Sequence, residues 1–212
     1  MPTNSQTESH PAPSTASAAG NAVEIRNAVD YLTGARRDKR LDRVTIALGA
    51  ELLALSGLAS GPDAGVAALR RALETGAAAE RFERMVAALG GPKDFISRAH
   101  RTLPQAPVLT DAAPETRGFV VSIDVRAVGL AVVELGGGRS RAADAIDPAV
   151  GLTELASIGA EVGPDAPLAR VHARSTDKAE AAVRRLRAAY RLDEAPLSPG
   201  DPVIERVVGT PQ

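Results

Sequence analysis

The stretch that decides the fold is RGFVVSIDVRAVGLAVVELGGGRSRAADAIDPAVGL, from Arg117 to Leu152. It opens with apolar residues that indicate a strand over 118–123. The residues that follow, 125–135, are mostly small and apolar and indicate a helix, which ends in a turn of three glycines and an arginine at 136–139. A strand, a helix and a glycine turn in this order are typical of a packed α+β unit.

The chain that follows this stretch continues the α+β pattern. Short strands are expected over 152–158 and 168–173, on either side of a Gly-Pro turn. An amphipathic helix is predicted over 177–190, and an apolar run over 203–208 favours a last strand. The sequence therefore predicts an α+β fold in which 105–212 form a C-terminal domain with a barrel-sandwich-like sheet.

The barrel-like shape is suggested by Gly159–Ala173, which is similar to the hairpin of biotinyl and lipoyl carrier barrels. A carrier of this kind needs a lysine at the exposed turn for attachment. Here the turn is Pro164-Asp165-Ala166 and contains no lysine. The segment therefore favours the shape of a carrier barrel and argues against its function.

Upstream of the α+β part, residues 20–104 are expected to form a helical segment, because apolar residues recur there with helical spacing. Asn21 and Glu24 can cap the first helix, and Asp42 can cap the second. The basic run between these two helices, 36–40, is interpreted as a solvated loop. The expected helices are 21–34, 42–57, 63–74, 77–89 and 94–100.

Composition excludes several classes of protein. The chain has 212 residues and a formal net charge of -1, and only 2% of its residues are aromatic, which argues against a nucleic-acid binder. It has no cysteine, in keeping with a reducing, cytoplasmic location. No apolar run reaches the ~20 residues of a membrane span. Residues 1–19 are rich in Ser, Thr, Pro and Ala, and we expect a disordered arm without a secretory signal.

The glycine turn is the first candidate for chemistry. Backbone N–H groups of Gly136–Gly138 together with Arg139 suit the binding of a phosphate. The turn, however, matches neither G-x-x-x-x-G-K-[ST] nor G-x-G-x-x-G, and it follows a helix where both motifs follow a strand. A structural turn is the favoured interpretation.

Acidic and histidine residues are the second group of candidates. Asp124, Asp144 and Asp147 can be interpreted as paired carboxylates for acid–base chemistry, but capping and turn formation by Asp is favoured. His100 is expected at a helix end, and His172 is expected to be half-buried in a strand. No two histidines have metal-ligand spacing, and no pairing of a nucleophile with a base is evident.

Five motifs in one order carry a resemblance to a known family. They resemble motifs of the thymidine phosphorylases and, more broadly, of the pyrimidine-nucleoside phosphorylases. The similarity is collinear over residues 20–208 of this chain and concerns only the C-terminal portion of those enzymes. The motifs are GNAVEIRNAVDYLTG at 20–34, the helix over 41–58, RFERMVAALGGPKDF at 81–95, the stretch quoted at the start, and PLARVHA at 167–173.

The resemblance implies pyrimidine salvage by a cytoplasmic pentosyltransferase. Family members cleave thymidine reversibly to thymine and 2-deoxyribose 1-phosphate, with phosphate as co-substrate and no further cofactor, and they are typically homodimers. Their K-x-S-T-G-G-type phosphate loop and their base-binding residues lie N-terminal to the matched region. No catalytic or phosphate-binding residue can therefore be assigned to this chain, and we expect it to be inactive alone.

One weaker site can be transferred from the family. Family members hold a monovalent cation with backbone carbonyls just before the Gly-Asn-Ala motif and with a Glu on the next helix. The aligned positions here are Ala18 and Asn27. The Asn side chain offers an oxygen but no charge. We therefore favour the interpretation that Asn27 is a helix residue that faces solvent.

Two hypotheses for the whole chain follow. The first is that it is the C-terminal part of a thymidine phosphorylase-family enzyme, truncated or with its start missed. The second is a non-catalytic interaction module or separately encoded subunit that retains the fold. In both, helices over 21–100 would lack the sheet they normally pack on, so we expect exposed apolar surface there.

Overall fold

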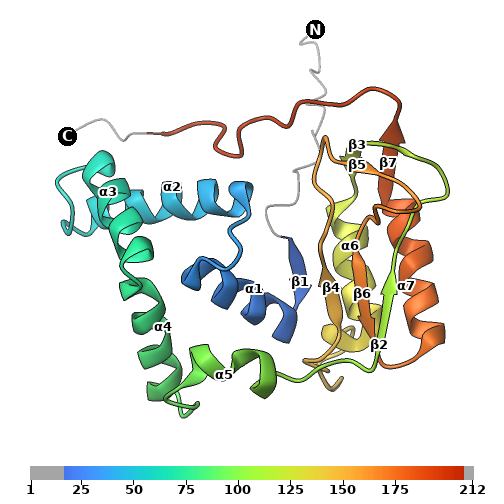
Figure 1. The fold of residues 1–212 in the computed structure, drawn as a ribbon, viewed down its shortest axis with the longest axis horizontal. Helices are drawn as coiled ribbons and strands as arrows, with labels where there is room; N and C mark the ends of the chain where they lie inside the picture. Colours follow the sequence, from blue (N-terminus) through green and yellow to red (C-terminus); the bar gives the residue numbers. More distant parts are fainter. Residues whose placement is uncertain (1–16, 208–212) are drawn as a thin grey trace, which may run out of the picture.

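The computed structural model describes residues 17–207, which form a helical part and an α+β part (Figure 1). In Figure 1 four helices lie around α1 on three of its sides, and the short strand β1 lies on the fourth. The helices of this part are α1 (Ala22–Thr33), α2 (Lys39–Leu55), α3 (Pro62–Glu74), α4 (Ala77–Ala88) and α5 (Phe95–Thr102).

A four-stranded antiparallel sheet joins the two parts, with the strand order β1-β4-β6-β2. Strand β1, which comes before all the helices in the chain, pairs with β4, so that Ala18 lies opposite Thr153. The helical part is thereby anchored at its N-terminal end to the second half of the chain. The four strands are β1 (Ala18–Gly20), β4 (Gly151–Thr153), β6 (Arg170–Ala173) and β2 (Val108–Asp111).

A second, three-stranded antiparallel sheet has the order β5-β3-β7 and a register shift in β3 between Val120 and Ser122. Its strands are β5 (Glu161–Val162), β3 (Gly118–Ile123) and β7 (Tyr190–Asp193). Helices α6 (Val125–Val132) and α7 (Thr176–Ala189) and the π-helical turn η1 (Val133–Gly137) complete this part. Within residues 17–207 neither sheet closes on itself.

One apolar core unites both sheets with α6 and α7. Val120 of β3, Leu152 of β4, Val171 of β6 and Leu186 of α7 are all fully buried and belong to the same cluster. The cluster is built from Ala, Val, Leu and Ile with Tyr190 as its one aromatic member, which agrees with the low aromatic content. Small side chains let the elements approach closely, and this core positions the loops described below.

The helical part is packed much less fully. It has two small clusters, centred on Phe95 and on Ile46, instead of one continuous core. In α2 only Ile46 and Ala50 are buried, and α4 buries no residue. The prediction of exposed apolar surface on these helices is confirmed. The exposed leucines and methionine of this part are Leu48, Leu52, Leu55, Leu58, Met85 and Leu89.

The C-terminal segment differs from its prediction. The last strand is β7, directly after α7, whereas the described part of the segment expected as a strand, 203–207, has no strand partner. Residues 194–207, here called the C-terminal tail, leave β7 and run back along the helical part beside α2 (Figure 1). An apolar run forms a strand only where another edge can pair with it, and the tail lies against helices instead.

The start of the described chain also differs. Ala18 and Ala19, which we expected within an irregular arm, form β1, and Ala18 is 5% exposed. Pairing with β4 supplies the backbone hydrogen bonds that the local sequence does not predict. Residues 1–16 of the expected arm lie outside the described residues, as does Val208 of the expected last strand.

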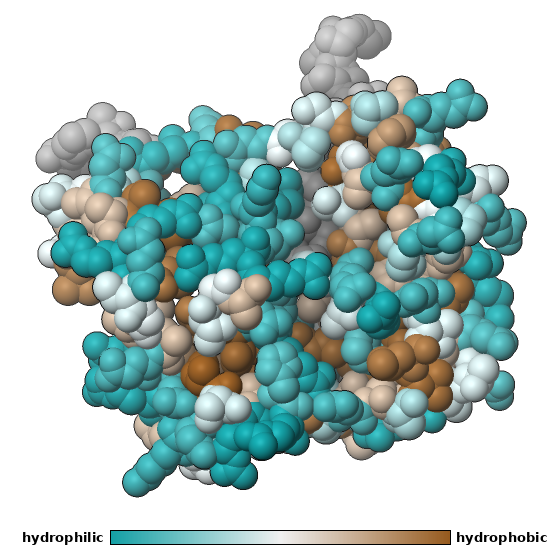
Figure 2. All heavy atoms as spheres, in the orientation of Figure 1, coloured by the Kyte–Doolittle hydropathy of each residue, from teal (hydrophilic) through white to brown (hydrophobic). Residues whose placement is uncertain are grey.

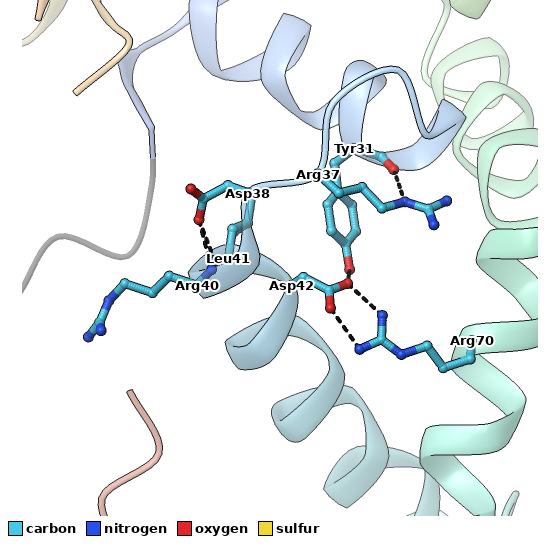
Figure 3. Close-up of polar contacts among 7 residues, drawn as sticks. All are labelled: Tyr31, Arg37, Asp38, Arg40, Leu41, Asp42 and Arg70. Atoms are coloured by element: carbon cyan, nitrogen blue, oxygen red, sulfur yellow. Dashed lines mark hydrogen bonds and ion pairs between the residues drawn. The ribbon is translucent and has the colours of Figure 1, made fainter. Parts of the chain in front are cut away.

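A polar cluster holds α1, α2 and α3 together (Figure 3). The Tyr31 hydroxyl donates to Asp42 Oδ1 at 2.9 Å, and Arg70 donates to both Asp42 oxygens, at 2.8 and 2.7 Å. Asp42 was predicted to cap α2, but Asp38 does so, because its side chain accepts from the backbone N–H groups of Arg40 and Leu41. The helix therefore begins at Lys39, inside the run expected to be a loop.

The cluster shifts the pKa of all three of its members, and the pKa of Arg70 is raised mainly by its hydrogen bond to Asp42. Arg70 holds the pKa of the Asp42 carboxyl below its ordinary value, mainly through the hydrogen bond it donates. Burial, and after it the neighbouring Asp42, raises the pKa of Tyr31 to about 12. Because the Asp42 pKa is lowered on folding, its stabilising contribution is present above the ordinary value of 3.8 and is lost as the pH falls below it.

We predict that Tyr31→Phe lowers the free energy of unfolding by about 1 to 2 kcal/mol, since the hydroxyl bond to a charged carboxylate is lost. Urea denaturation at pH 7 measures this change. The loss should shrink as the pH falls below 3.8 and then through the lowered pKa of Asp42, where the folded protein loses the carboxylate charge. As a control, Arg98→Gln removes an exposed ion pair to Asp94 and should change stability by less than about 0.5 kcal/mol. Equal effects of the two substitutions would contradict the prediction.

Candidate functional site

The sequence motifs converge where β1 turns into α1, beside β4. At this corner two glycines face one another: Gly20 has φ +145° and Gly151 has φ +155°. A Cβ atom on Gly151 would lie 2.6 Å from the Ala19 carbonyl oxygen, and one on Gly20 would lie 2.9 Å from the Val150 carbonyl oxygen. Both positions therefore require glycine. Gly20 of the Gly-Asn-Ala motif and Gly151 of the Val-Gly pair in the opening stretch form the two halves of one backbone contact between β1 and β4.

Asn21 links this corner to the glycine turn. Its side-chain amide donates to the Gly137 carbonyl at 2.8 Å, and the backbone N–H of Ala22 donates to the Pro148 carbonyl at 3.0 Å. The predicted capping pair is thus only half right. Glu24 reaches back to accept from Gly20 N–H at 2.7 Å, but the Asn21 side chain makes no cap bond.

Carbonyl groups of the glycine turn and the Arg139 side chain bind within the protein. The Gly136 carbonyl accepts from Asp147 N–H at 2.8 Å, and Lys178 Nζ donates to the Leu135 carbonyl at 3.3 Å. Arg139 donates through Nε to the Asp144 carbonyl at 3.1 Å, within its own loop. Gly137 packs tightly, because a Cβ there would lie 2.9 Å from Val132 Cγ1. This geometry supports the interpretation as a structural turn.

Each of the three candidate aspartates has a structural partner. Asp124 caps α6 by accepting from Ala127 N–H at 2.9 Å. Asp144 accepts from the N–H groups of Ser140 and Arg141 at 3.0 and 2.8 Å, which closes the loop after the glycine turn.

Asp147 binds Arg174 through two bonds, at 2.6 and 2.8 Å, and Arg174 holds the pKa of this carboxyl below its ordinary value. Asp147 also accepts from Ala149 N–H at 3.0 Å, which helps to shape the turn that leads into β4. Capping, turn formation and ion pairing thus account for the contacts of all three carboxylates.

The histidines lie apart, on different elements. His100, near the end of α5, has Nε2 3.3 Å from Asp30 Oδ1. His172 in β6 is half-buried as predicted, with Nε2 2.9 Å from Thr153 Oγ1. Burial, and then the nearby positive charges of Arg26 and Arg170, lower the pKa of His172. Between residues 17 and 207 no three His, Cys, Asp or Glu side chains gather in a way that suits a metal ion.

The two positions suggested for a monovalent cation lie on neighbouring elements, Ala18 in β1 and Asn27 in α1. Asn27 is half-buried, which corrects its interpretation as a solvent-facing residue. Its Oδ1 atom accepts a long hydrogen bond of 3.5 Å from the Ser17 hydroxyl. The Ser17 hydroxyl and Asn27 Oδ1 are thus two neutral oxygens near each other. Such oxygens suit a hard cation chemically but supply no charge to hold it strongly.

Sequence reasoning missed a cleft between the helical part and the α+β part. It has a volume of about 530 Å³ and is lined by residues 38–40 and 43 at the start of α2, by 155–158 after β4, and by 199–202 of the C-terminal tail. Arg43 pairs with Asp201 across it at 3.0 Å. The signal that could have indicated the cleft is the Pro-Gly-Asp-Pro sequence at 199–202, which is typical of a turn.

Comparison with known proteins identifies relatives of this chain. The family model described as "Pyrimidine nucleoside phosphorylase C-terminal domain" matches residues 119–193. Thymidine phosphorylase of Burkholderia lata is 52% identical over 92% of the chain, and that of Mesorhizobium japonicum is 51% identical over 91%. Each match covers 44% of the relative, so the chain spans less than half the length of these proteins, in their C-terminal part.

None of the helices between residues 17 and 207 combines the length and the apolar character that crossing a membrane requires.

We predict that Gly151→Ala lowers the free energy of unfolding by at least about 2 kcal/mol, because the new methyl group meets the β1 backbone at a φ that is strained for alanine. Thermal or urea unfolding measures this. The matched control is Gly129→Ala inside α6, where no atom lies within 4 Å of the new Cβ. That change should instead stabilise the protein by about 0.5 to 1 kcal/mol. If both variants shift stability in the same direction, the glycine contact is not the constraint described.

Proposed function

We propose that this chain serves the reversible phosphorolysis of thymidine to thymine and 2-deoxyribose 1-phosphate, because it belongs to the pyrimidine nucleoside phosphorylase family as a C-terminal portion of the thymidine phosphorylase type. In this proposal the chain contributes structure to the enzyme and not the groups that contact the reacting atoms. Pyrimidine nucleoside and phosphate are the proposed ligands of the complete assembly, which is proposed to be cytoplasmic and homodimeric.

The observation that carries the proposal is the structural use that this chain makes of the motifs that carry the family resemblance. The glycines and Asn21 build the corner and the turn, and Asp124 and Asp147 serve a helix cap and an ion pair. Phosphorolysis requires groups that position phosphate and stabilise charge on the departing base. The 212-residue sequence contains no K-x-S-T-G-G motif for the first of these tasks, which supports a structural role for the chain.

The shape of the α+β part fits this role. Both sheets share one core with α6 and α7, an arrangement that supports the barrel-sandwich-like character proposed for the domain. Such a core can hold the β1–α1 corner and the glycine turn rigidly against each other. Rigid support of this kind keeps catalytic groups carried elsewhere within a productive geometry.

A second candidate function is a non-catalytic interaction module, or a separately encoded subunit, that retains the fold. The observation that favours it is the apolar surface of α2, with Leu55 82% exposed. Surface of this kind marks a protein–protein contact in many soluble proteins.

We predict that the purified 212-residue chain releases no thymine from thymidine above the no-enzyme background, with or without phosphate. Release is measured by chromatography of the reaction mixture, and the full-length thymidine phosphorylase of Burkholderia lata serves as the active control. Robust phosphate-dependent turnover by the chain alone would show that its own residues carry the chemistry, and the structural role would be rejected.

We also propose that the Ala18 and Asn27 positions bind a monovalent cation only weakly, because neither residue supplies a carboxylate. Asn27→Glu supplies the charge that the family places on this helix. At a potassium concentration ten times the Kd, binding would add about 1.4 kcal/mol to stability.

The expected result is a larger rise in Tm between choline chloride and potassium chloride, at equal ionic strength, for Asn27→Glu than for the wild type. Asn27→Gln is the neutral control and should behave like the wild type. An identical potassium response of all three proteins would contradict a cation site at this position.

A further inference from the structure

The start of α2 brings three basic side chains to the cleft between the helical part and the α+β part. These are Lys39, Arg40 and Arg43, and the carboxylates that line the cleft with them are Asp38 and Asp201. Both carboxylates are already bound within the protein. Asp38 accepts from backbone N–H groups at the start of α2, and Asp201 pairs with Arg43 at 3.0 Å. The cleft therefore holds more positive charge than its own carboxylates compensate.

Arg40 is the basic residue of the cleft with the poorest partners. Its Nε atom is buried without a hydrogen-bond partner, and no other side-chain nitrogen or oxygen of residues 17–207 is in this state. Its Nη1 atom makes only a long contact, of 3.5 Å, with the Gly200 carbonyl oxygen in the tail. In Figure 3 the Arg40 side chain points away from the polar cluster of α1, α2 and α3. A buried N–H without an acceptor destabilises the state that contains it, so this edge of the guanidinium group lacks an acceptor that a ligand can supply.

The wall on the α+β side of the cleft is apolar, as is much of the tail that borders it. Leu155, Ala156 and Ile158 line the cleft after β4, and Pro199 and Pro202 line it from the tail. Figure 2 shows the same contrast, because hydrophilic residues predominate over α2 while apolar residues show on the neighbouring α+β part. A volume of about 530 Å³ is in the range of pockets that hold small organic molecules. The cleft therefore suits a molecule with an anionic group at one end and an apolar body.

The tail supplies an internal competitor for such a molecule. Asp201 places its carboxylate on Arg43, and the preceding Gly200 carbonyl faces Arg40. The side chains of Arg43 and Asp201 are 54% and 51% exposed, so solvent screens this ion pair and it is weak. An oxyanion from outside can displace the Asp201 carboxylate and accept from Arg40 as well, in the bidentate geometry that guanidinium groups favour.

We propose that this cleft binds a small organic anion, with a phosphate or carboxylate head and a compact apolar body. The head accepts hydrogen bonds from Arg40 and Arg43, and it takes the place of Asp201 as the tail moves aside. Lys39 adds a positive charge at the border of the site. The apolar body packs against Leu155 and the residues that follow it.

The test is isothermal titration calorimetry of the full 212-residue chain at pH 7. The probes are phenyl phosphate and benzoate, which share an aromatic body and differ in the anionic head. Benzyl alcohol is the neutral probe, and inorganic phosphate is the head without a body. The site variant is Arg40→Gln, and its matched control is Arg84→Gln, which changes an exposed arginine of α4 outside the cleft. Circular dichroism and Tm establish that each variant is folded.

The expected result is saturable 1:1 binding of at least one aromatic anion to the wild-type chain, and no binding of benzyl alcohol at the same concentration. Arg40→Gln should weaken the affinity by at least about tenfold, since hydrogen bonds to a charged group are lost. Arg84→Gln should stay within about twofold of wild type, because it changes an exposed charge outside the cleft. Tighter binding of phenyl phosphate assigns the site to phosphate esters, and tighter binding of benzoate assigns it to carboxylates.

Asp201→Asn gives a second test with the opposite sign. Removing the competing carboxylate should strengthen the binding of the preferred anion, by about threefold or more, because the screened ion pair no longer has to be broken. An unchanged or weaker affinity would contradict the displacement of Asp201.

The absence of saturable binding by both aromatic anions would overturn the proposed site, as would equal affinities of Arg40→Gln and Arg84→Gln. Inorganic phosphate that binds as tightly as phenyl phosphate would overturn the assignment to an organic ligand, because the apolar wall would then contribute nothing. These measurements involve neither a nucleoside nor turnover, so the presence or absence of phosphorolysis does not affect their outcome.

Discussion

The close approach of β1 and β4 is the contact on which the rest of the structure depends. Because Gly20 and Gly151 have no side chains, the two backbones can lie side by side where a methyl group would meet a carbonyl oxygen. This pairing adds β1 as an edge strand to the four-stranded sheet, sets where α1 begins, and brings Asn21 to the glycine turn. Without it, five helices would be attached to the α+β part mainly through the linker before β2 and through the tail.

The sequence predicted features that are encoded locally and missed those that depend on distant partners. The helix that ends at Gly34 and the cap at Asp124 were predicted correctly, since left-handed glycines and Asp caps leave local signals. The start of α2 was misplaced at Asp42, because the local sequence does not show that this carboxylate binds Tyr31 and Arg70 from other helices.

The errors in strands have the same cause. Strand β7 starts at Tyr190, directly after α7, without an intervening turn residue. The sequence therefore gives no local signal that the helix ends and a strand begins. Strand β1 is three residues long, and its partner lies more than 130 residues further along the chain. In the candidate site, capping and turn formation were predicted for Asp144 and Asp147. The cleft lined by the tail was not predicted, because its walls come from separate segments of the chain.

The course of the C-terminal tail has a practical consequence for anyone who handles this protein. After β7 the chain returns to the helical part, so Val207 lies in the same groove as Leu55. A purification tag, fluorescent protein or surface linker fused beyond this point would emerge beside α2 and crowd that face. Immobilisation through an exposed side chain of the α+β part, such as Arg184 on α7, would leave the helical face open to solution.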